Sequence, residues 1–228
     1  MSSLTVVLPT LNEAGNIGPL IASLKSTLAD ASPDFLVIDG NSRDETAREA
    51  ADAGATVITD ANGYCSALMR GMQEATTEWV LVLDADGSHR ADDARKLWDA
   101  RHDADLVVGS RMTRDGGSSG AAYRRALSRV LAGLFASFAR LPARDVSSGF
   151  RLYRRAMFAD AQPVARFFEV QPTLLAHAVK QGGRVKEVGI YYHPRDKGRS
   201  KNRVLRFGVA FLGCLWRIRR DLRRSRPL

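Results

Sequence analysis

The sequence predicts an open, doubly wound α/β fold, in which a mostly parallel sheet carries helices on both of its faces. Two observations lead to this fold class. Apolar runs with almost no polar alternation recur through the first 110 residues, as in strands that are buried on both faces. Segments with helical spacing of apolar residues separate these runs. The chain has 228 residues, 45% of them hydrophobic, which is enough for one such domain with a sizeable core.

The elements alternate regularly along the first half of the chain. Strands are expected at residues 4–9, 34–39, 55–59, 79–84 and 105–110, where β-branched and other apolar residues cluster. Helices are expected between them, at residues 14–28, ending near Ala50, at 64–75 and at 91–101. The regular alternation of strand and helix predicts parallel pairing of the strands.

Two carboxylates follow the fourth expected strand. In "VLVLDADGSH", residues 80–89, four apolar residues lead directly into Asp84 and Asp86. Ligands of such sheets bind outside the carboxyl ends of the strands, so we expect this pair in the ligand crevice. The same tripeptide recurs at residues 103–105, but there it precedes a strand. We therefore expect Asp103 and Asp105 at the opposite edge of the sheet, as solvated surface.

Polar residues also follow the first two expected strands. The three polar stretches are residues 9–13, 39–44 and 84–86. Each has a plain structural interpretation, with Asn12 and Ser42 as helix caps and Asp44 as a favourable charge in a first helical turn. Because all three stretches converge on one crevice, a shared ligand is the better interpretation of the set.

The motifs exclude some nucleotide sites and favour another. Neither a P-loop nor a G-x-G-x-x-G follows the first strand, so glycine-rich backbone does not cradle the phosphates. The alternative is Mg²⁺ or Mn²⁺ held by Asp84 and Asp86, bridging two phosphates and neutralising charge on a leaving diphosphate. Glu13 and Asp39 are expected near the base and ribose. Carboxylates accept hydrogen bonds, which suits the ring N–H of uracil or guanine.

Six stretches in order carry a resemblance: "VVLPTLNEAGNI", "VIDGNSRDET", "LVLDADGSH", "VVGSRM", "DVSSGFRLY" and "RDKGRSK". Together they resemble the family-2 glycosyltransferases, whose fold is the Rossmann-like GT-A fold, and especially the polyprenyl-phosphate (dolichyl-phosphate) mannose synthases. The match spans about residues 4–202. It implies a catalytic domain at residues 1–202, followed by a basic amphipathic helix at 203–228.

The resemblance implies an inverting, metal-dependent transfer of a hexose, with mannose and GDP-mannose favoured, to a polyprenyl or dolichyl phosphate. Asp84, Asp86, Arg111 and Arg124 match its catalytic positions, and the two aspartates match its metal ligands. The implied nucleotide-sugar-binding residues are Pro9, Leu11, Glu13, Asp39, Asp84, Ala85, Asp86, Ser88, Arg195, Ser200 and Lys201. The implied contacts of the acceptor phosphate are Arg111, Arg124, Arg125 and Ser128. Leu11 and Ser88 depart from the family's usual aromatic residue and glutamine.

Acceptor chemistry leaves two alternatives open. A phosphate monoester has a second pKa of about 6, so it attacks as a dianion and needs arginines more than a general base. A related transferase with a UDP-sugar donor such as UDP-glucose, or with a hydroxyl acceptor, would need a base, for which Asp145 is the candidate. Nucleic-acid binding by the basic tail is not expected, because such binding predicts aromatic residues interleaved with the basic ones, and Trp216 alone supports it poorly.

The charge pattern favours an anionic membrane surface as a partner. The net charge is +9, and residues 203–228 hold eight arginines and one aspartate. On a helical wheel Val204, Phe207, Phe211, Leu215, Ile218 and Leu222 share one face, opposite Arg206, Arg217, Arg220 and Arg224. The second candidate is a helix over 123–141, with Tyr123, Leu127, Val130, Leu134 and Phe138 aligned.

The expected location is the cytoplasmic face of a membrane, with the chain bound peripherally. The longest apolar run, residues 207–216, is ten residues and too short to span a bilayer. Cys65 and Cys214 have no metal-ligand spacing, and the N-terminus lacks the basic region of a signal peptide. A membrane-embedded partner or a second copy of the chain is compatible with this pattern.

Overall fold

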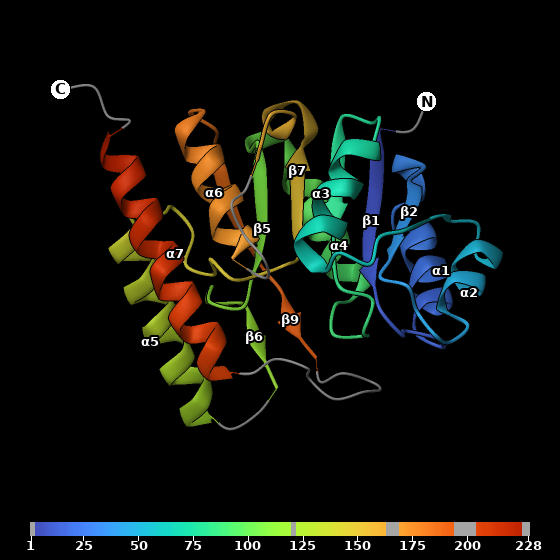
Figure 1. The fold of residues 1–228 in the computed structure, drawn as a ribbon, viewed down its shortest axis with the longest axis horizontal. Helices are drawn as coiled ribbons and strands as arrows, with labels where there is room; N and C mark the ends of the chain where they lie inside the picture. The colour runs from blue at the N-terminus through green and yellow to red at the C-terminus, as the bar shows by residue number, and fades with distance from the viewer. Residues whose placement is uncertain (1–2, 120–121, 163–168, 194–203, 225–228) are drawn as a thin grey trace.

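The structure is a computed structural model that describes residues 3–119, 122–162, 169–193 and 204–224. Its centre is a seven-stranded sheet with the order β3-β2-β1-β4-β7-β5-β8 (Figure 1). The strands are β1 Leu4–Thr10, β2 Asp34–Asp39, β3 Thr56–Thr59, β4 Trp79–Val82, β5 Leu106–Ser110, β7 Arg151–Arg154 and β8 Val185–Gly189. Only β7 runs antiparallel to its neighbours in this sheet, which confirms the predicted mostly parallel fold. A second sheet pairs β6 Gly117–Ser118 with β9 Tyr191–Tyr192.

Helices cover both faces of the sheet. The α-helices are α1 Ile17–Thr27, α2 Thr46–Asp52, α3 Tyr64–Glu74, α4 Ala91–Asp99, α5 Ala122–Ala139, α6 Val170–Lys180 and α7 Val204–Arg224. Alternate residues of a strand point to opposite faces, and β4 shows the result: Val80 packs with one core cluster and Leu81 with the other. One cluster includes residues of α1, α2 and α4, and the other includes residues of α3, α5, α6 and α7. Burial on both faces explains the unbroken apolar runs.

The predicted helix at 14–28 starts three residues late, at Ile17. Before it, Asn12 and Gly15 adopt positive φ values of 58° and 79°, which an α-helix cannot contain. Residues 12–16 therefore form a loop at the carboxyl end of β1.

Asp105 corrects the prediction of solvated surface at residues 103–105. Asp103 is exposed, as expected, but the exposed fraction of Asp105 is only 9%. Its Oδ1 accepts a hydrogen bond from Arg154 Nη1 at 2.9 Å, and its Oδ2 accepts one from the backbone N–H of Arg184 at 2.9 Å. This aspartate ties the start of β5 to its two neighbouring strands.

The C-terminal helix corrects a second prediction. Leu215 and Ile218 of α7 are buried in the core, and Leu222 packs against it, so this part of the apolar face does not meet a membrane. Figure 1 shows α7 alongside α5. The predicted stripe on α5 is exposed instead: Val130, Leu134 and Phe138 have exposed fractions of 59%, 60% and 41%. Of the helices within the described ranges, none is long and apolar enough to cross a membrane.

Candidate active site

A crevice of about 330 Å³ opens at the carboxyl ends of the parallel strands. Six of the predicted donor-site residues line it together: Pro9, Leu11, Glu13, Asp84, Ala85 and Asp86. They come from the ends of β1 and β4, which are neighbours in the sheet. The strand-end prediction thus placed these residues at the correct edge.

The loop after β4 holds the two carboxylates. Asp84 is partly exposed, whereas the exposed fraction of Asp86 is 4%. Asp86 Oδ1 accepts hydrogen bonds from the backbone N–H of Ser88, at 3.1 Å, and from the Ser88 hydroxyl. Gly87 between them has a φ of 80°, which favours glycine. Ser88 is fully buried and is not one of the residues that line the crevice. We predicted that it contacts the nucleotide sugar, but in the structure it orients Asp86 instead.

The side chain of His89 is hydrogen-bonded to the backbone of the same loop. Its Nδ1 accepts a hydrogen bond from the backbone N–H of Asp84 at 3.1 Å. The ring lies 4.7 Å from that of Phe150 and 5.5 Å from that of Tyr192, measured between centroids. Burial lowers the pKa of His89 to about 4, against the opposing effect of Asp86, so the ring is neutral at pH 7. The neutral ring with Nδ1 as acceptor carries its proton on Nε2.

Asp39 lies at the carboxyl end of β2 as predicted, but its side chain does not line the crevice, whereas the adjacent Gly40 does. The exposed fraction of Asp39 is 3%. The carboxylate accepts hydrogen bonds from the backbone N–H of Ser42 at 2.9 Å, from the Ser42 hydroxyl at 2.5 Å and from the Thr10 hydroxyl at 3.4 Å. Asp39 therefore shapes the loop after β2, and direct contact with a nucleoside would require this loop to rearrange.

The loops after β1 and β2 cap each other. The backbone N–H of Asn12 donates to Ser42 Oγ at 2.9 Å, and the backbone N–H of Arg43 donates to Asn12 Oδ1 at 2.9 Å. Ala14 donates through its backbone N–H to Asp44 Oδ2 at 3.3 Å. Asn12 and Ser42 therefore join the two loops and are not helix caps as predicted, since the N-cap residues of α1 and α2 are Asn16 and Glu45.

The crevice also contains residues that the sequence analysis did not select. Asp60, Gly63, Tyr64 and Ala67 line it from the end of β3 and the first turn of α3. Asp60 accepts a hydrogen bond from the Ser66 hydroxyl at 2.7 Å, and this bond helps to hold the pKa of Asp60 below its ordinary value. The available signal was the polar stretch "DANG" at residues 60–63, which follows a strand as the other three stretches do.

Tyr64 connects the crevice to the rest of the site. Burial, followed by the charge of Asp84, raises its pKa well above 10, and its hydroxyl oxygen accepts a hydrogen bond from Gln171 Nε2 at 3.0 Å. A Cβ atom on Gly149 would lie 2.9 Å from Tyr64 Oη and 3.7 Å from Asp84 Oδ1. Gly149 therefore lies close to Tyr64 and to Asp84 of the acid pair.

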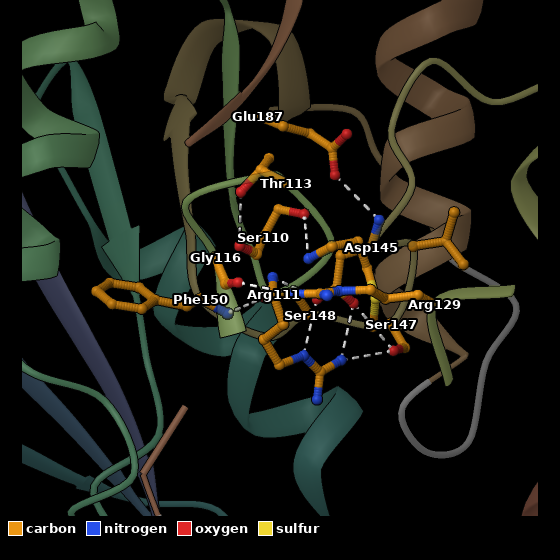
Figure 2. Close-up of polar contacts among 12 residues, drawn as sticks. Ser110, Arg111, Thr113, Gly116, Arg129, Asp145, Ser147, Ser148, Phe150 and Glu187 are labelled. Atoms are coloured by element: carbon orange, nitrogen blue, oxygen red, sulfur yellow. Dashed lines mark hydrogen bonds and ion pairs between the residues drawn. The ribbon is translucent and has the colours of Figure 1, made fainter. Parts of the chain in front are cut away.

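Arg111 and Asp145 form an ion pair beside this loop (Figure 2). Arg111 Nε donates to Asp145 Oδ2 and Nη2 donates to Oδ1, both at 2.8 Å, and the backbone N–H of Arg111 adds a bond of 3.0 Å. Nη2 also donates to Ser147 Oγ at 3.1 Å. The guanidinium lies 5.6 Å from the centroid of the Tyr192 ring, which also contacts His89. Asp145 and Ser147 thus fix the orientation of Arg111. Burial alone would lower the pKa of Arg111, but nearby charges, among them those of Asp145 and Asp84, raise it.

Asp145 is a poor candidate for a general base in this arrangement. Its exposed fraction is 1%. Burial alone would raise its pKa, but the charge and hydrogen bonds of Arg111 outweigh burial and hold the pKa below its ordinary value. The carboxylate therefore stays ionised at neutral pH, with both oxygens bonded to Arg111.

The remaining predicted site residues are not placed by the structure. Arg124, Arg125 and Ser128 belong to α5, but their side chains lie outside the described part of the molecule. Arg195, Ser200 and Lys201 lie outside the described residues altogether. Their roles stay predictions from the motifs.

A GT-A-like sheet with a carboxylate pair at the mouth of its crevice defines the class of protein as a glycosyltransferase. The family model "Glycosyl transferase family 2" matches residues 5–161, and the chain belongs to that family. An uncharacterized glycosyltransferase of Mycobacterium tuberculosis is 35% identical over 219 residues, which are 95% of this chain and 97% of the relative. These matches identify the chain as a hexosyltransferase.

Two relatives have named lipid substrates. The undecaprenyl-phosphate mannosyltransferase of Micrococcus luteus is 29% identical, covering 88% of this chain and 87% of the relative. The dolichol-phosphate mannosyltransferase of Pyrococcus furiosus is 27% identical, covering 86% of this chain and 58% of the relative.

Solved structures agree on the fold. Mannosyl-3-phosphoglycerate synthase of Rubrobacter xylanophilus has a TM-score of 0.77 at 22% identity, covering 100% of this chain and 77% of that one. Glucosyl-3-phosphoglycerate synthase of Mycobacterium tuberculosis, in complex with Mn²⁺, UDP and phosphoglyceric acid, has a TM-score of 0.75 at 20% identity, covering 96% and 78%. At this level of identity the likeness concerns the fold alone.

Proposed function

We propose that this chain transfers a hexose, with mannose favoured, from a nucleotide sugar to a polyprenyl phosphate, with inversion at the anomeric carbon. The observation that carries the proposal is the carboxylate pair Asp84 and Asp86 in the crevice, within electrostatic reach of Arg111, which the buried Asp145 holds in place. The mannosyltransferases of Micrococcus luteus and Pyrococcus furiosus, which act on lipid phosphates by name, support the acceptor class.

The donor would occupy the crevice beside Pro9, Leu11 and Glu13, with its diphosphate toward the acid pair. Two carboxylates suit Mg²⁺ or Mn²⁺, because such ions bind through one or two carboxylates together with substrate phosphates. When bound there, the ion would neutralise charge on the departing diphosphate. The M. tuberculosis synthase that shares the fold is a complex with Mn²⁺ and UDP, which agrees with this chemistry. GDP-mannose is the favoured donor, on the motifs alone.

The acceptor side would need charge and orientation more than proton transfer. A phosphate oxygen forms the new bond to the anomeric carbon, while the bond from that carbon to the nucleoside diphosphate breaks. A phosphate monoester with a pKa of about 6 is already a dianion at pH 7, so no proton has to be removed. Arg111, held in a fixed orientation by Asp145, would bind that dianion beside the donor. Arg124, Arg125 and Ser128 would complete the acceptor site, and Arg195, Ser200 and Lys201 would cover the donor.

The alternative is a UDP-sugar donor with a hydroxyl acceptor, and one assay separates the two. The protein is incubated with GDP-mannose, UDP-glucose and related donors in the presence of Mg²⁺ or Mn²⁺. Nucleoside diphosphate release is measured with a short polyprenyl phosphate, with 3-phosphoglycerate, and with no acceptor. Release from one donor that depends on the lipid phosphate, and that ends when EDTA is added, is the expected result. Turnover with 3-phosphoglycerate but not with the lipid would refute the lipid acceptor.

A further inference from the structure

A second pocket lies between α5, the segment that follows it and β8, and it shares no lining residue with the donor crevice. Its volume is about 550 Å³, within the range of small-ligand sites. Three arginines line it, Arg129, Arg140 and Arg144, against a single carboxylate, Glu187. The excess of positive charge fits an anionic ligand.

The end of α5 shapes one side of this pocket. Arg140 has a φ of 57°, and the backbone N–H groups of Arg140 and Leu141 bond back to the carbonyl oxygens of Ser137 at 3.2 Å and Ala136 at 3.0 Å. This left-handed turn ends the helix, and the chain then carries Arg144 along the same pocket.

Contacts shown in Figure 2 fix the other side of the pocket. Arg129 Nη2 donates to the carbonyl oxygen of Gly116 at 3.0 Å. Glu187 Oε1 accepts a hydrogen bond from the backbone N–H of Asp145 at 3.0 Å, so the one acidic side chain of the pocket is bonded to the backbone. The same bond connects the pocket wall to the partner of Arg111.

An exposed apolar stripe runs beside the pocket. Val130, Leu134 and Phe138 each follow a pocket-lining residue of α5 by one position, and so lie about 100° further round the helix. Their exposed fractions are 59%, 60% and 41%. A soluble phosphate would need the arginines but not the stripe. An amphiphile with an anionic head uses both, because its head and its chains have separate partners.

We propose that this pocket binds the phosphate headgroup of an anionic phospholipid, whose acyl chains lie along Val130, Leu134 and Phe138. Guanidinium groups bind phosphate through paired hydrogen bonds, which suits Arg140 and Arg144 to the headgroup. Arg111 does not line this pocket, and occupancy would place the Arg111 side of the molecule against a bilayer. Membrane docking is thereby assigned to α5 and its C-terminal turn, in place of the buried face of α7.

The test compares two double variants that remove the same charge. R140A/R144A removes two arginines of the pocket, and R48A/R70A removes two exposed arginines of α2 and α3. Binding of each protein to phosphatidylcholine vesicles is measured with and without phosphatidylglycerol. Equal melting temperatures establish that both variants fold. No nucleotide sugar is present, so the result does not depend on the proposed transfer.

We expect the wild type to bind only the vesicles that contain phosphatidylglycerol. R140A/R144A should bind them about 25-fold more weakly, since an arginine near an anionic surface contributes about fivefold. R48A/R70A should bind like the wild type, and Leu134→Gln should also weaken binding. Equal losses in the two double variants would refute the proposal, because net charge would then explain the attraction.

A second measurement distinguishes a lipid headgroup from a soluble phosphate ester as the ligand of this pocket. Glycerol 3-phosphate is titrated alone, and we expect it to bind weakly and to leave vesicle binding intact. If it binds as tightly as the vesicles do, and only R140A/R144A loses this binding, the pocket takes a soluble phosphate ester and the lipid assignment is wrong.

Discussion

The tripeptide Asp-Ala-Asp occurs at both edges of the sheet, and its two copies have different surroundings. After β4, Asp84 and Asp86 line an open crevice, and Asp86 is oriented by the N–H and hydroxyl of Ser88. Before β5, Asp105 lies beneath a helix-to-strand turn and accepts a hydrogen bond from the guanidinium of Arg154. The first copy lines a crevice that can hold a ligand, whereas Asp105 of the second copy is paired with an arginine side chain of the protein.

In this comparison, the direction of the neighbouring strand separates a ligand site from a structural ion pair. Asp84 and Asp86 follow the carboxyl end of β4 and face the crevice that the helices leave open. A carboxylate at the amino end meets the close packing of the helix-to-strand turns. Asp145 resembles Asp105 in this respect. Although Asp145 lies near the crevice, its charge is neutralised by the guanidinium of Arg111.

The largest expected effect distinguishes the two copies directly. Asp86→Asn should lower kcat/KM by about 10³-fold, because a carboxylate that holds a metal and diphosphate supports several kcal/mol of transition-state stabilisation. The matched variant Asp105→Asn should keep wild-type kcat/KM and lose stability, because Arg154 then faces a neutral amide. Steady-state kinetics and urea unfolding measure the two effects. Equal activity losses in both variants would remove the distinction between the two edges.

The second prediction tests whether Asp145, an ion-paired acid near the crevice, orients Arg111 and does not act as a base. Asp145→Asn should destabilise the protein by about 3 kcal/mol, because it leaves the partly buried Arg111 without its counter-ion. Each of Asp145→Asn and Arg111→Ala should lower kcat/KM by about 10²-fold, as for the loss of one charged group that orients a reacting anion. The double variant should be no worse than either single variant, since both remove one unit.

The pH profile of kcat/KM is the control for this cycle. If Asp145 acts as a general base, Asp145→Asn removes an acidic limb that Arg111→Ala retains. If it positions Arg111, both variants change the profile in the same way. Urea unfolding of all three variants checks that the activity losses do not come from unfolded protein.

The fold could be predicted wherever burial leaves unbroken apolar runs. All five predicted strands exist, because each is covered on both faces or pairs beside one that is. No strand was predicted at β7, which begins with Arg151. That arginine is fully buried, with its guanidinium bonded to the carbonyl oxygens of Ser148, Val146 and Gln171 at 2.6–2.9 Å. A cage of carbonyl groups leaves no trace in the local sequence pattern.

The site was predictable to the edge of the sheet but not to the direction of each side chain. Asp84 and Asp86 lie where strand topology places them, but the Asp39 carboxylate accepts hydrogen bonds from Ser42, and the Ser88 hydroxyl donates to Asp86. These directions depend on the local loop conformation, which the apolar pattern does not report. The pairing of Arg111 with Asp145, 34 residues apart, depends instead on the distance between loops that are remote in the sequence.

The smallest predicted effect is a pH dependence of stability that comes from His89, beside the loop after β4. The loop after β4 rests on a histidine whose pKa is about 4, against an ordinary value of about 6.5. Between these values the unfolded chain binds a proton that the folded chain does not, so stability falls as the pH falls through this window. The expected loss from pH 7 to pH 5 is about 2 kcal/mol.

The test replaces His89 by asparagine, whose side-chain oxygen can still accept the hydrogen bond from the Asp84 N–H but cannot take up a proton in this window. Urea unfolding at several pH values between 7 and 5 should show a flatter dependence for His89→Asn than for the wild type. His102→Asn makes the same replacement at an exposed histidine and is the matched control. Slopes that are equal in all three proteins would show that His89 does not stay neutral below pH 6.5 in the folded protein.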